Sequence, residues 1–272
     1  MKQRLISSVI YFLLLLSILV INIPIVDTII VVLISSIAMH EYNRAFRAVG
    51  YNPISFVGYI GCLSMFLLGM PIDAMTKMLI IRIGLPILVI LLFMYIILRN
   101  LKVTVIDVAI TVLSLIYIPF MFSFLKLVLA MTNSRAIVWY VLLGAFMSDI
   151  MGYFIGKRFG KRKLCPTISP KKTVEGSIAG IVGVTISYVI LNVVLTKLGI
   201  LHLNTILVII MGVVCAIVGQ FGDLSASAIK RYCGVKDFGS IMPGHGGILD
   251  RCDSILFVAP VVYIFLKVYF GM

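Results

Sequence analysis

The sequence predicts an all-α, polytopic integral membrane protein. Its 272 residues are 62% hydrophobic and only 12% charged, with a mean hydropathy of +1.19. These values leave too few polar groups to cover a water-soluble globule of this size. Apolar runs close to the roughly 20 residues that a helix needs to cross the hydrocarbon core recur along the whole chain. We therefore expect about nine transmembrane helices.

The expected helices follow one another in order, separated by short polar connections. The first run passes through Pro24 into the second with no small-residue cleavage site, which favours a retained helix over a signal peptide. The fourth contains Arg82, which lies near its start and can reach the interface, and Pro86, which transmembrane helices tolerate. The nine runs are 5–23, 25–39, 54–70, 78–98, 103–125, 136–155, 176–198, 205–220 and 254–270.

The distribution of lysine and arginine predicts which side of the membrane each connection faces. With the N-terminus inside, 17 of the 23 basic residues fall on the inner connections and 6 on the outer ones. Because cytoplasmic connections carry the excess of cations, we expect the N-terminus and the polar loops 156–175 and 223–253 to be cytoplasmic. The net charge of +13 is then explained without nucleic acid, since loop cations orient helices and meet anionic headgroups.

The five cysteines indicate neither a zinc site nor a disulfide framework. They are scattered, with no CxxC or histidine-paired spacing, and are most simply reduced thiols. The chain shows no second soluble domain, low-complexity tract or internal repeat. Function must therefore come from the loops and from the ends of the helices.

The polar loop 223–253 concentrates acidic residues, with four of the ten in the chain. Asp250 and Asp253 are three residues apart, so both lie on one face if a helix begins there. With Asp223 at the end of the preceding run, they can supply the hard oxygen ligands that Mg²⁺ prefers. The alternative is a solvated, ion-paired loop, which must bear the cost of placing three carboxylates beside the bilayer without a cation.

The same loop contains the run Pro243-Gly244-His245-Gly246-Gly247, which excludes a regular helix. Its glycines let the backbone approach a ligand closely, as in phosphate-binding loops, although the P-loop pattern is not present. His245 by itself is more often a structural hydrogen-bonding residue than a catalyst.

The segment 169–176 indicates a phosphate site. Pro170 favours extended backbone before it, and Thr173 is suited to cap the next helix. Lys171 and Lys172 then lie beside a helix N-terminus, where backbone N–H groups and the helix dipole favour a phosphate. A simple helix-start loop is the alternative.

Asp149 lies within an otherwise apolar run, one turn from Tyr153. An ionisable group at membrane depth is a functional candidate, because its desolvation must be offset by a partner or a cation. A hydrogen bond or salt bridge to a neighbouring helix is the alternative. The basic run 157–163 that follows is typical of a topogenic, lipid-facing patch.

The last polar loop also carries a long and uncommon pattern, Ser227-x-x-Lys230-Arg231-x4-Lys236-Asp237-x-Gly239-x3-Pro243-x-His245-Gly246-Gly247-x-x-Asp250-Arg251-x-Asp253. This pattern resembles the signature of the phosphatidate cytidylyltransferases, also called CDP-diacylglycerol synthases. Segments 149–156 and 169–176 resemble further elements of that family, in its order and spacing. The resemblance covers about residues 136–254, while the first five runs agree only in being hydrophobic. Met242 stands where the family usually has Leu, Ile or Phe.

The resemblance implies that CTP and phosphatidate give CDP-diacylglycerol and pyrophosphate, in a catalytic region 126–272 that follows an N-terminal transmembrane region 1–125. Two polyanions must meet, so divalent metal and several cations are needed to offset their repulsion. We expect Mg²⁺, with a second cation implied by the resemblance, on Asp149, Asp223, Asp250 and Asp253. The expected catalytic residues are Asp223, Asp250, Asp253, Lys230, Lys236, Asp237, His245 and Arg251. The expected substrate- and phosphate-binding residues are Ser169, Lys171, Lys172, Thr173, Glu175, Ser227, Arg231, Gly246 and Gly247.

Two other functions stay open at this point. CTP-dependent kinases of polyprenols or phytol share the membrane setting and overlapping chemistry, but they transfer the terminal phosphate. A transporter could line a pathway with Asp107 and Asp149, although it has no need of a glycine-rich and acidic loop on one face. The sequence also leaves open whether the chain works as a homodimer.

Overall fold

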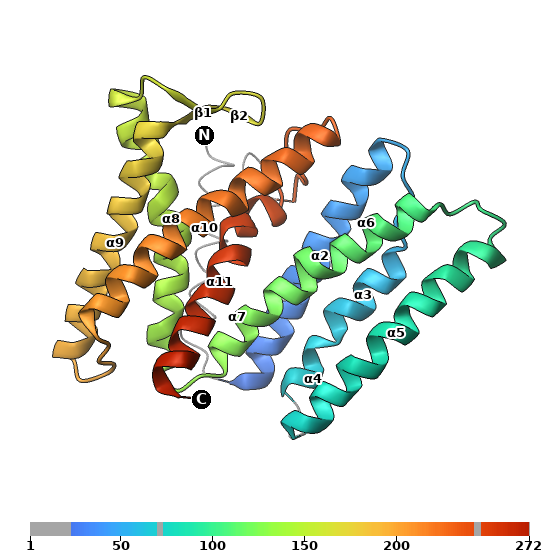
Figure 1. Ribbon diagram of the computed structural model, residues 1–272, viewed down its shortest axis with the longest axis horizontal. Coiled ribbons are helices and arrows are strands. Elements are labelled where there is room, and N and C mark those ends of the chain that lie inside the picture. Colours follow the sequence, from blue (N-terminus) through green and yellow to red (C-terminus); the bar gives the residue numbers. More distant parts are fainter. Residues whose placement is uncertain (1–22, 70–72, 242–245, 272) are drawn as a thin grey trace.

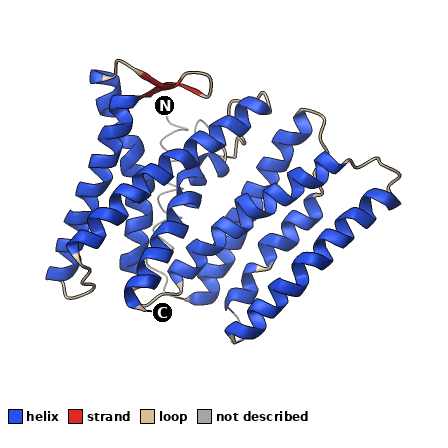
Figure 2. Cartoon of the chain, in the orientation of Figure 1, coloured by secondary structure: helices blue, strands red, loops and turns tan. Residues whose placement is uncertain are grey.

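The chain is built almost wholly from long helices (Figure 2). The computed structural model describes residues 23–69, 73–241 and 246–271. Seven helical stretches within these residues are long and apolar enough to cross a membrane, which confirms an all-α, multi-pass membrane protein. The expected first helix, 5–23, lies outside the described residues, so the count of nine and the side of the N-terminus stay predictions.

The N-terminal half places one helix at the edge of the molecule and a kinked span nearer its centre (Figure 1). Its elements are α2 (Pro24–Ala48), α3 (Ser55–Leu63), α4 (Met65–Gly69), α5 (Ala74–Leu98), α6 (Val105–Leu115), the π-helical turn η1 (Ile116–Phe120) and α7 (Met121–Leu129). The last three run as one span, and η1 contains Pro119, which has no N–H to give to the helix. Most large apolar side chains of α5 are exposed, as expected for a helix that faces lipid.

The C-terminal half consists of four long helices that pack closely on one another. They are α8 (Ser134–Phe159), α9 (Val174–Lys197), α10 (Thr205–Tyr232) and α11 (Leu249–Phe270). A Cβ on Gly176 of α9 would lie 2.6 Å from the Gly152 carbonyl oxygen of α8, and a Cβ on Gly222 of α10 would lie 2.7 Å from the Asp253 carbonyl oxygen of α11. Glycine at these crossings therefore lets the helix backbones approach each other.

A two-stranded antiparallel hairpin connects α8 to α9 and adds a small sheet to the predicted all-α fold. Strand β1 (Lys163–Cys165) pairs with β2 (Ser169–Thr173), with Lys163 opposite Thr173. The extended backbone expected around Pro170 is thus part of β2. Because β2 runs directly into α9, its lysines are held at the start of that helix.

Several helix boundaries differ from the prediction. The second expected run ends at residue 39, whereas α2 continues to Ala48, and α10 and α11 extend into the expected loop 223–253, leaving 233–248 as the connection. Hydropathy alone misplaces these ends, because charged side chains on a terminal turn can reach water while the helix continues. The helix expected over 54–70 is interrupted in the described residues, and its crossing of the membrane stays a prediction. It breaks at Ser64, whose hydroxyl donates to the Gly61 carbonyl oxygen (2.7 Å).

The polar segments meet at one end of the bundle, where the hairpin, the end of α2 and the end of α10 lie (Figure 1). Arg231 of α10 donates from Nε to the Ile168 carbonyl oxygen of the hairpin (3.2 Å). Arg44 of α2 donates from Nη2 to the Phe238 carbonyl oxygen in the connection between α10 and α11 (3.0 Å). Segments far apart in the sequence therefore form one polar surface.

The close approach of α8 and α9 makes a stability prediction. Gly176→Ala should destabilise the fold by about 1–3 kcal/mol, because its Cβ would overlap backbone atoms of α8 that cannot move independently. The thermal unfolding midpoint of the detergent-solubilised protein measures this. Gly84→Ala on α5 is the matched control, since its Cβ would meet nothing within 4 Å. Equal midpoints for the two variants would contradict the packing argument.

Candidate functional site

A cavity of about 280 Å³ opens between α8, α9, α10 and the hairpin. Six of its lining residues are expected site residues, and they come from three separate elements, α8, β2 and α10: Asp149, Ser169, Lys171, Lys172, Thr173 and Asp223. The structure therefore brings the membrane-depth aspartate, the lysine pair and the end of α10 together. A cavity with two ammonium groups and two carboxylates on its wall suits a phosphate ligand with an accompanying cation.

Lys172 and Asp223 form an ion pair across this cavity, between β2 and α10. Their side chains are 25% and 22% exposed, so the attraction between them is screened less than it would be at a free surface. Asp149 also interacts electrostatically with Lys172 and Asp223. The residue expected to bind phosphate and the residue expected to bind metal thus neutralise each other in this structure.

The start of α9 is organised as expected, with one addition. The Thr173 hydroxyl accepts a hydrogen bond from Gly176 N (3.1 Å), which confirms Thr173 as the helix cap. The Glu175 carboxylate accepts from Arg162 N, at 3.2 and 3.3 Å from its two oxygens. Glu175 therefore fastens the beginning of the hairpin, whereas Lys171 and Lys172 line the cavity.

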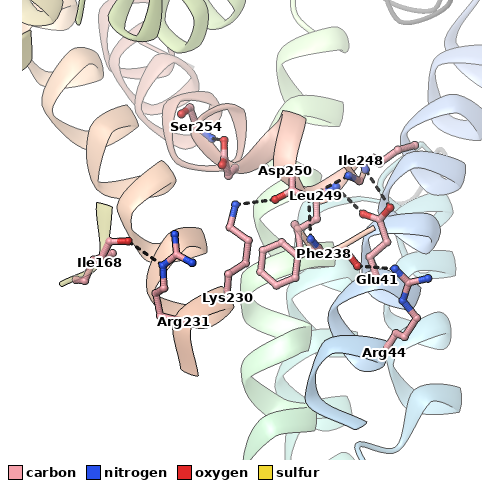
Figure 3. A network of polar contacts seen from close by, with 12 residues as sticks. Glu41, Arg44, Ile168, Lys230, Arg231, Phe238, Ile248, Leu249, Asp250 and Ser254 are labelled. Atoms are coloured by element: carbon pink, nitrogen blue, oxygen red, sulfur yellow. Dashed lines mark hydrogen bonds and ion pairs between the residues drawn. The ribbon is translucent and has the colours of Figure 1, made fainter. Parts of the chain in front are cut away.

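Asp250 organises the connection between α10 and α11. Its Oδ1 binds Lys230 Nζ of α10 at 2.6 Å, and its Oδ2 accepts from Phe238 N (2.8 Å) and Gly247 N (2.9 Å), as Figure 3 shows in part. The Asp250 side chain is only 2% exposed, so these three partners offset the cost of its burial. Asp250 thus closes the connection 233–248 onto the start of α11.

Asp253 lies in the first turns of the same helix and links Asp250 to the cavity. The helix start at Leu249 confirms the condition under which Asp250 and Asp253 share a face. Asp253 is buried and interacts electrostatically with Asp223 and Asp149. We call Asp149, Asp223 and Asp253 the acidic cluster, because their charges influence one another.

The other expected residues of the α10–α11 connection surround this cluster. Gly246 has a φ of +84°, a left-handed conformation that favours glycine, and its Cβ position lies 3.0 Å from Asp250 Oδ2. Lys236 and Asp237 are exposed, and Ser227 is half-buried on α10. His245 lies outside the described residues.

Two further cations of the expected site have different surroundings. Arg231 binds the hairpin through the Ile168 carbonyl oxygen, so it ties the two polar segments together. Arg251 is exposed on the first turn of α11 and interacts electrostatically with Asp149. Arg251 does not line the cavity itself, whereas Arg231 ties the hairpin that forms part of the cavity wall to α10.

Three polar residues near the site were missed by sequence reasoning. Glu41 of α2 accepts hydrogen bonds from the start of α11. The Tyr117 hydroxyl is buried in η1, finds no hydrogen-bond partner in the described chain, and interacts electrostatically with Asp253 and Asp223. Ser148 has an orphaned hydroxyl beside the cavity. The only available signal was a polar residue in or next to an apolar run.

Asp107, which a transport pathway would use, has a local structural role. Its Oδ1 accepts from Asn52 N (2.6 Å), and its Oδ2 accepts from the Thr104 backbone and hydroxyl, both at 2.8 Å. Thr104 and Asp107 form a capping box at the start of α6. Because these bonds account for both oxygens, nothing in the surroundings of Asp107 supports an ion pathway.

The acidic cluster fits a hard divalent cation in donor chemistry. Its carboxylates come from α8, α10 and α11, and their mutual repulsion favours a bound cation. In the described ranges, no three Asp, Glu, His or Cys side chains form a ready-made coordination shell. A cation would compete with Lys172 for Asp223.

Comparison with known proteins extends the similarity over nearly the whole chain. The model of the cytidylyltransferase family matches residues 2–269. A phosphatidate cytidylyltransferase of Bacillus subtilis is 34% identical over 277 residues, which cover 99% of this chain and 98% of the relative. One from Staphylococcus epidermidis is 34% identical, covering 78% and 80% of the two chains, and one from Thermotoga maritima is 40% identical over 59% of each. The similarity thus includes the first helices.

The buried pair of Lys230 and Asp250 yields a second stability prediction. Lys230→Met should cost about 3 kcal/mol, because it leaves a buried carboxylate without its cation. The double variant Lys230→Met with Asp250→Asn should be more stable than Lys230→Met alone. Thermal unfolding of the purified proteins measures both changes, and Lys236→Met, at an exposed lysine of the same connection, is the control. If Lys230→Met and Asp250→Asn lowered the unfolding midpoint independently, so that the double variant lost the sum of both, the pairing would be contradicted.

Proposed function

We propose that this chain, which belongs to the cytidylyltransferase family, transfers the cytidylyl group of CTP to phosphatidate and releases CDP-diacylglycerol and pyrophosphate. Relatives with this activity in their names match the chain over 99% and over 59% of its length. The observation that carries the proposal is the cavity that gathers Lys171, Lys172, Asp149 and Asp223 at the polar end of the bundle.

The lysines of β2 bind the phosphates of the substrates. Lys171 and Lys172 stand beside the N-terminus of α9, so two ammonium groups and the helix dipole act on the same ligand. A phosphate that binds Lys172 replaces its contact with Asp223. Asp223 is thereby released for a cation at the moment when the anionic substrate arrives.

The reaction is an in-line displacement at the α-phosphorus of CTP. A phosphate oxygen of phosphatidate forms the new P–O bond, and the bond from the α-phosphorus to the oxygen that bridges to the β-phosphate breaks. The electron pair of that bond leaves with pyrophosphate. No general base is required, because a phosphate monoester is mostly dianionic near neutral pH. The lysines and Arg251 hold the two polyanions together against their repulsion.

Asp149, Asp223, Asp250 and Asp253 would hold Mg²⁺, and a second cation can share so acidic a site. Asp250 Oδ1 is bonded only to Lys230 and keeps a lone pair for a metal, whereas its Oδ2 already accepts two backbone N–H groups. Bound Mg²⁺ supplies charge that stabilises the transferring phosphorus and the departing pyrophosphate.

The site faces the cytoplasm from the cell membrane. The excess of lysine and arginine lies on the connections at the polar end of the bundle, which is the pattern of a cytoplasmic face. CTP reaches the cavity from water. Phosphatidate enters from the bilayer with its acyl chains still in lipid, because the cavity lies between membrane-spanning helices.

The position of the transferred phosphorus tests the proposed reaction. Detergent-solubilised protein with phosphatidate, Mg²⁺ and CTP labelled at the α-phosphorus should place the label in lipid, and CTP labelled at the γ-phosphorus should not. Excess chelator should abolish transfer, because the carboxylates then lack their cation. Entry of the γ label into lipid would show a kinase, and lipid flux without CTP consumption would show a transporter.

The role of the lysine pair is tested by Lys171→Ala. We expect kcat/KM to fall about 10- to 100-fold, which corresponds to the loss of a charge-assisted contact to phosphate. Steady-state kinetics with CTP and phosphatidate measures the change. Lys197→Ala, at the last turn of α9 and so at the other end of the helix that follows β2, is the matched control and should leave the kinetics unchanged. If Lys171→Ala equals the parent, the segment 169–176 is only a helix start.

A further inference from the structure

The carboxylate of Glu41, from α2, binds the start of α11 (Figure 3). Its Oε1 accepts from Ile248 N at 3.1 Å, and its Oε2 accepts from Leu249 N at 2.8 Å, so that it caps α11 from more than 200 residues away in the sequence. Glu41 is 1% exposed. Burial of this carboxylate is offset by the two N–H groups and by the positive end of the α11 dipole.

Two glycines of the signature pattern make room for this carboxylate. A Cβ on Gly247 would overlap both oxygens of Glu41, and a Cβ on Gly239 would overlap Oε1. Neither glycine has a positive φ, so the need is for space and not for a special backbone conformation. The absence of a side chain at Gly239 and Gly247 therefore leaves the space that the Glu41 carboxylate occupies.

The same helix, α2, also contacts a second position in the connection between α10 and α11. Arg44, one turn beyond Glu41, donates from Nη2 to the Phe238 carbonyl oxygen at 3.0 Å, and Phe238 N donates to Asp250. One face of α2 thus contacts this connection at Phe238 and at its last residue, Ile248 (Figure 3).

We infer that Glu41 is a positioning residue for the reaction. It acts through the connection that comprises the described residues 233–241 and 246–248, which we call the signature loop. Glu41 fixes the register of this loop against α11, and with it the direction of the Asp250 carboxylate and of the helix turn that bears Asp253. The N-terminal half of the chain therefore completes the site. The kinetic part of this inference rests on the proposed function, whereas the structural part stands alone.

Glu41→Ala in the full-length, detergent-solubilised protein tests the inference. Amides of the signature loop and of Leu249 should exchange hydrogen about tenfold faster, because two charge-assisted bonds are lost. kcat should fall roughly 10- to 100-fold through misplacement of the acidic side chains, with a smaller change in KM for CTP. Glu41→Gln keeps the size and one carbonyl acceptor, so it should recover part of both properties.

Asp73→Ala is the matched control. Asp73 is an exposed carboxylate that caps α5 by accepting from Thr76 N (2.8 Å), away from the signature loop. Its removal also deletes a carboxylate helix cap from the N-terminal half. Exchange in the signature loop and kcat should therefore stay at parental values, which separates a positioning effect from general loss of a cap.

A double-mutant cycle with Gly247→Ala identifies the contact itself. In the parent the new Cβ meets Glu41, whereas in the Glu41→Ala background that obstacle is gone. Gly247→Ala should therefore lower the unfolding midpoint and kcat less in the second background than in the first. Equal losses in both backgrounds, or unchanged loop exchange in Glu41→Ala, would overturn the inference.

A parent protein that forms no CDP-diacylglycerol would refute the proposed function. Hydrogen exchange and unfolding would still decide the role of Glu41.

Discussion

Carboxylates at the ends of membrane helices constrain this structure, because each one loses water on burial and must find a cation or an N–H donor. Asp223 forms an ion pair with Lys172, and Asp250 binds Lys230 and two backbone N–H groups. Glu41 accepts hydrogen bonds from two backbone N–H groups at the start of α11. Each solution joins different elements: β2 to α10, α10 to α11, and α2 to α11. The polar end of the bundle is thereby held together by charge, where apolar packing between membrane helices could not specify partners so closely.

The two aspartate pairings differ in a way that matters for function. Lys172 and Asp223 meet at an open cavity, and in the proposed function each gives up the other for a phosphate or a cation. Asp250 is almost fully enclosed, and two of its three bonds go to backbone that shapes the signature loop. In the proposed function, Asp223 therefore belongs to a site where ligands exchange, and Asp250 to the rigid structure that supports this site. Phosphoryl transfer requires such precise positioning of charged groups.

Much of the site followed from local rules. Thr173 caps α9 because a hydroxyl before a helix satisfies a free N–H group, and Asp250 and Asp253 share a face because the helix starts just before them. The ends of α2 and α10 were misplaced, since hydropathy reports the apolar part of a helix and not the charged turns that follow it. The hairpin between α8 and α9 was missed because its short strands have little apolar alternation to reveal them.

The membrane class, the approximate number and order of the apolar runs, and the residues of the family pattern could be predicted without coordinates, because composition, run length and spacing are properties of the chain alone. The sequence did not show which cation or N–H group is the partner of each carboxylate. The Glu41 side chain accepts a hydrogen bond from Leu249, which lies 208 residues further along the chain. Lys172 of β2 pairs with Asp223 of α10, although α9 lies between these elements in the sequence. These partners are set by the packing of the helices, because burial and distance, which govern the strength of a charge interaction, are established only in the folded chain.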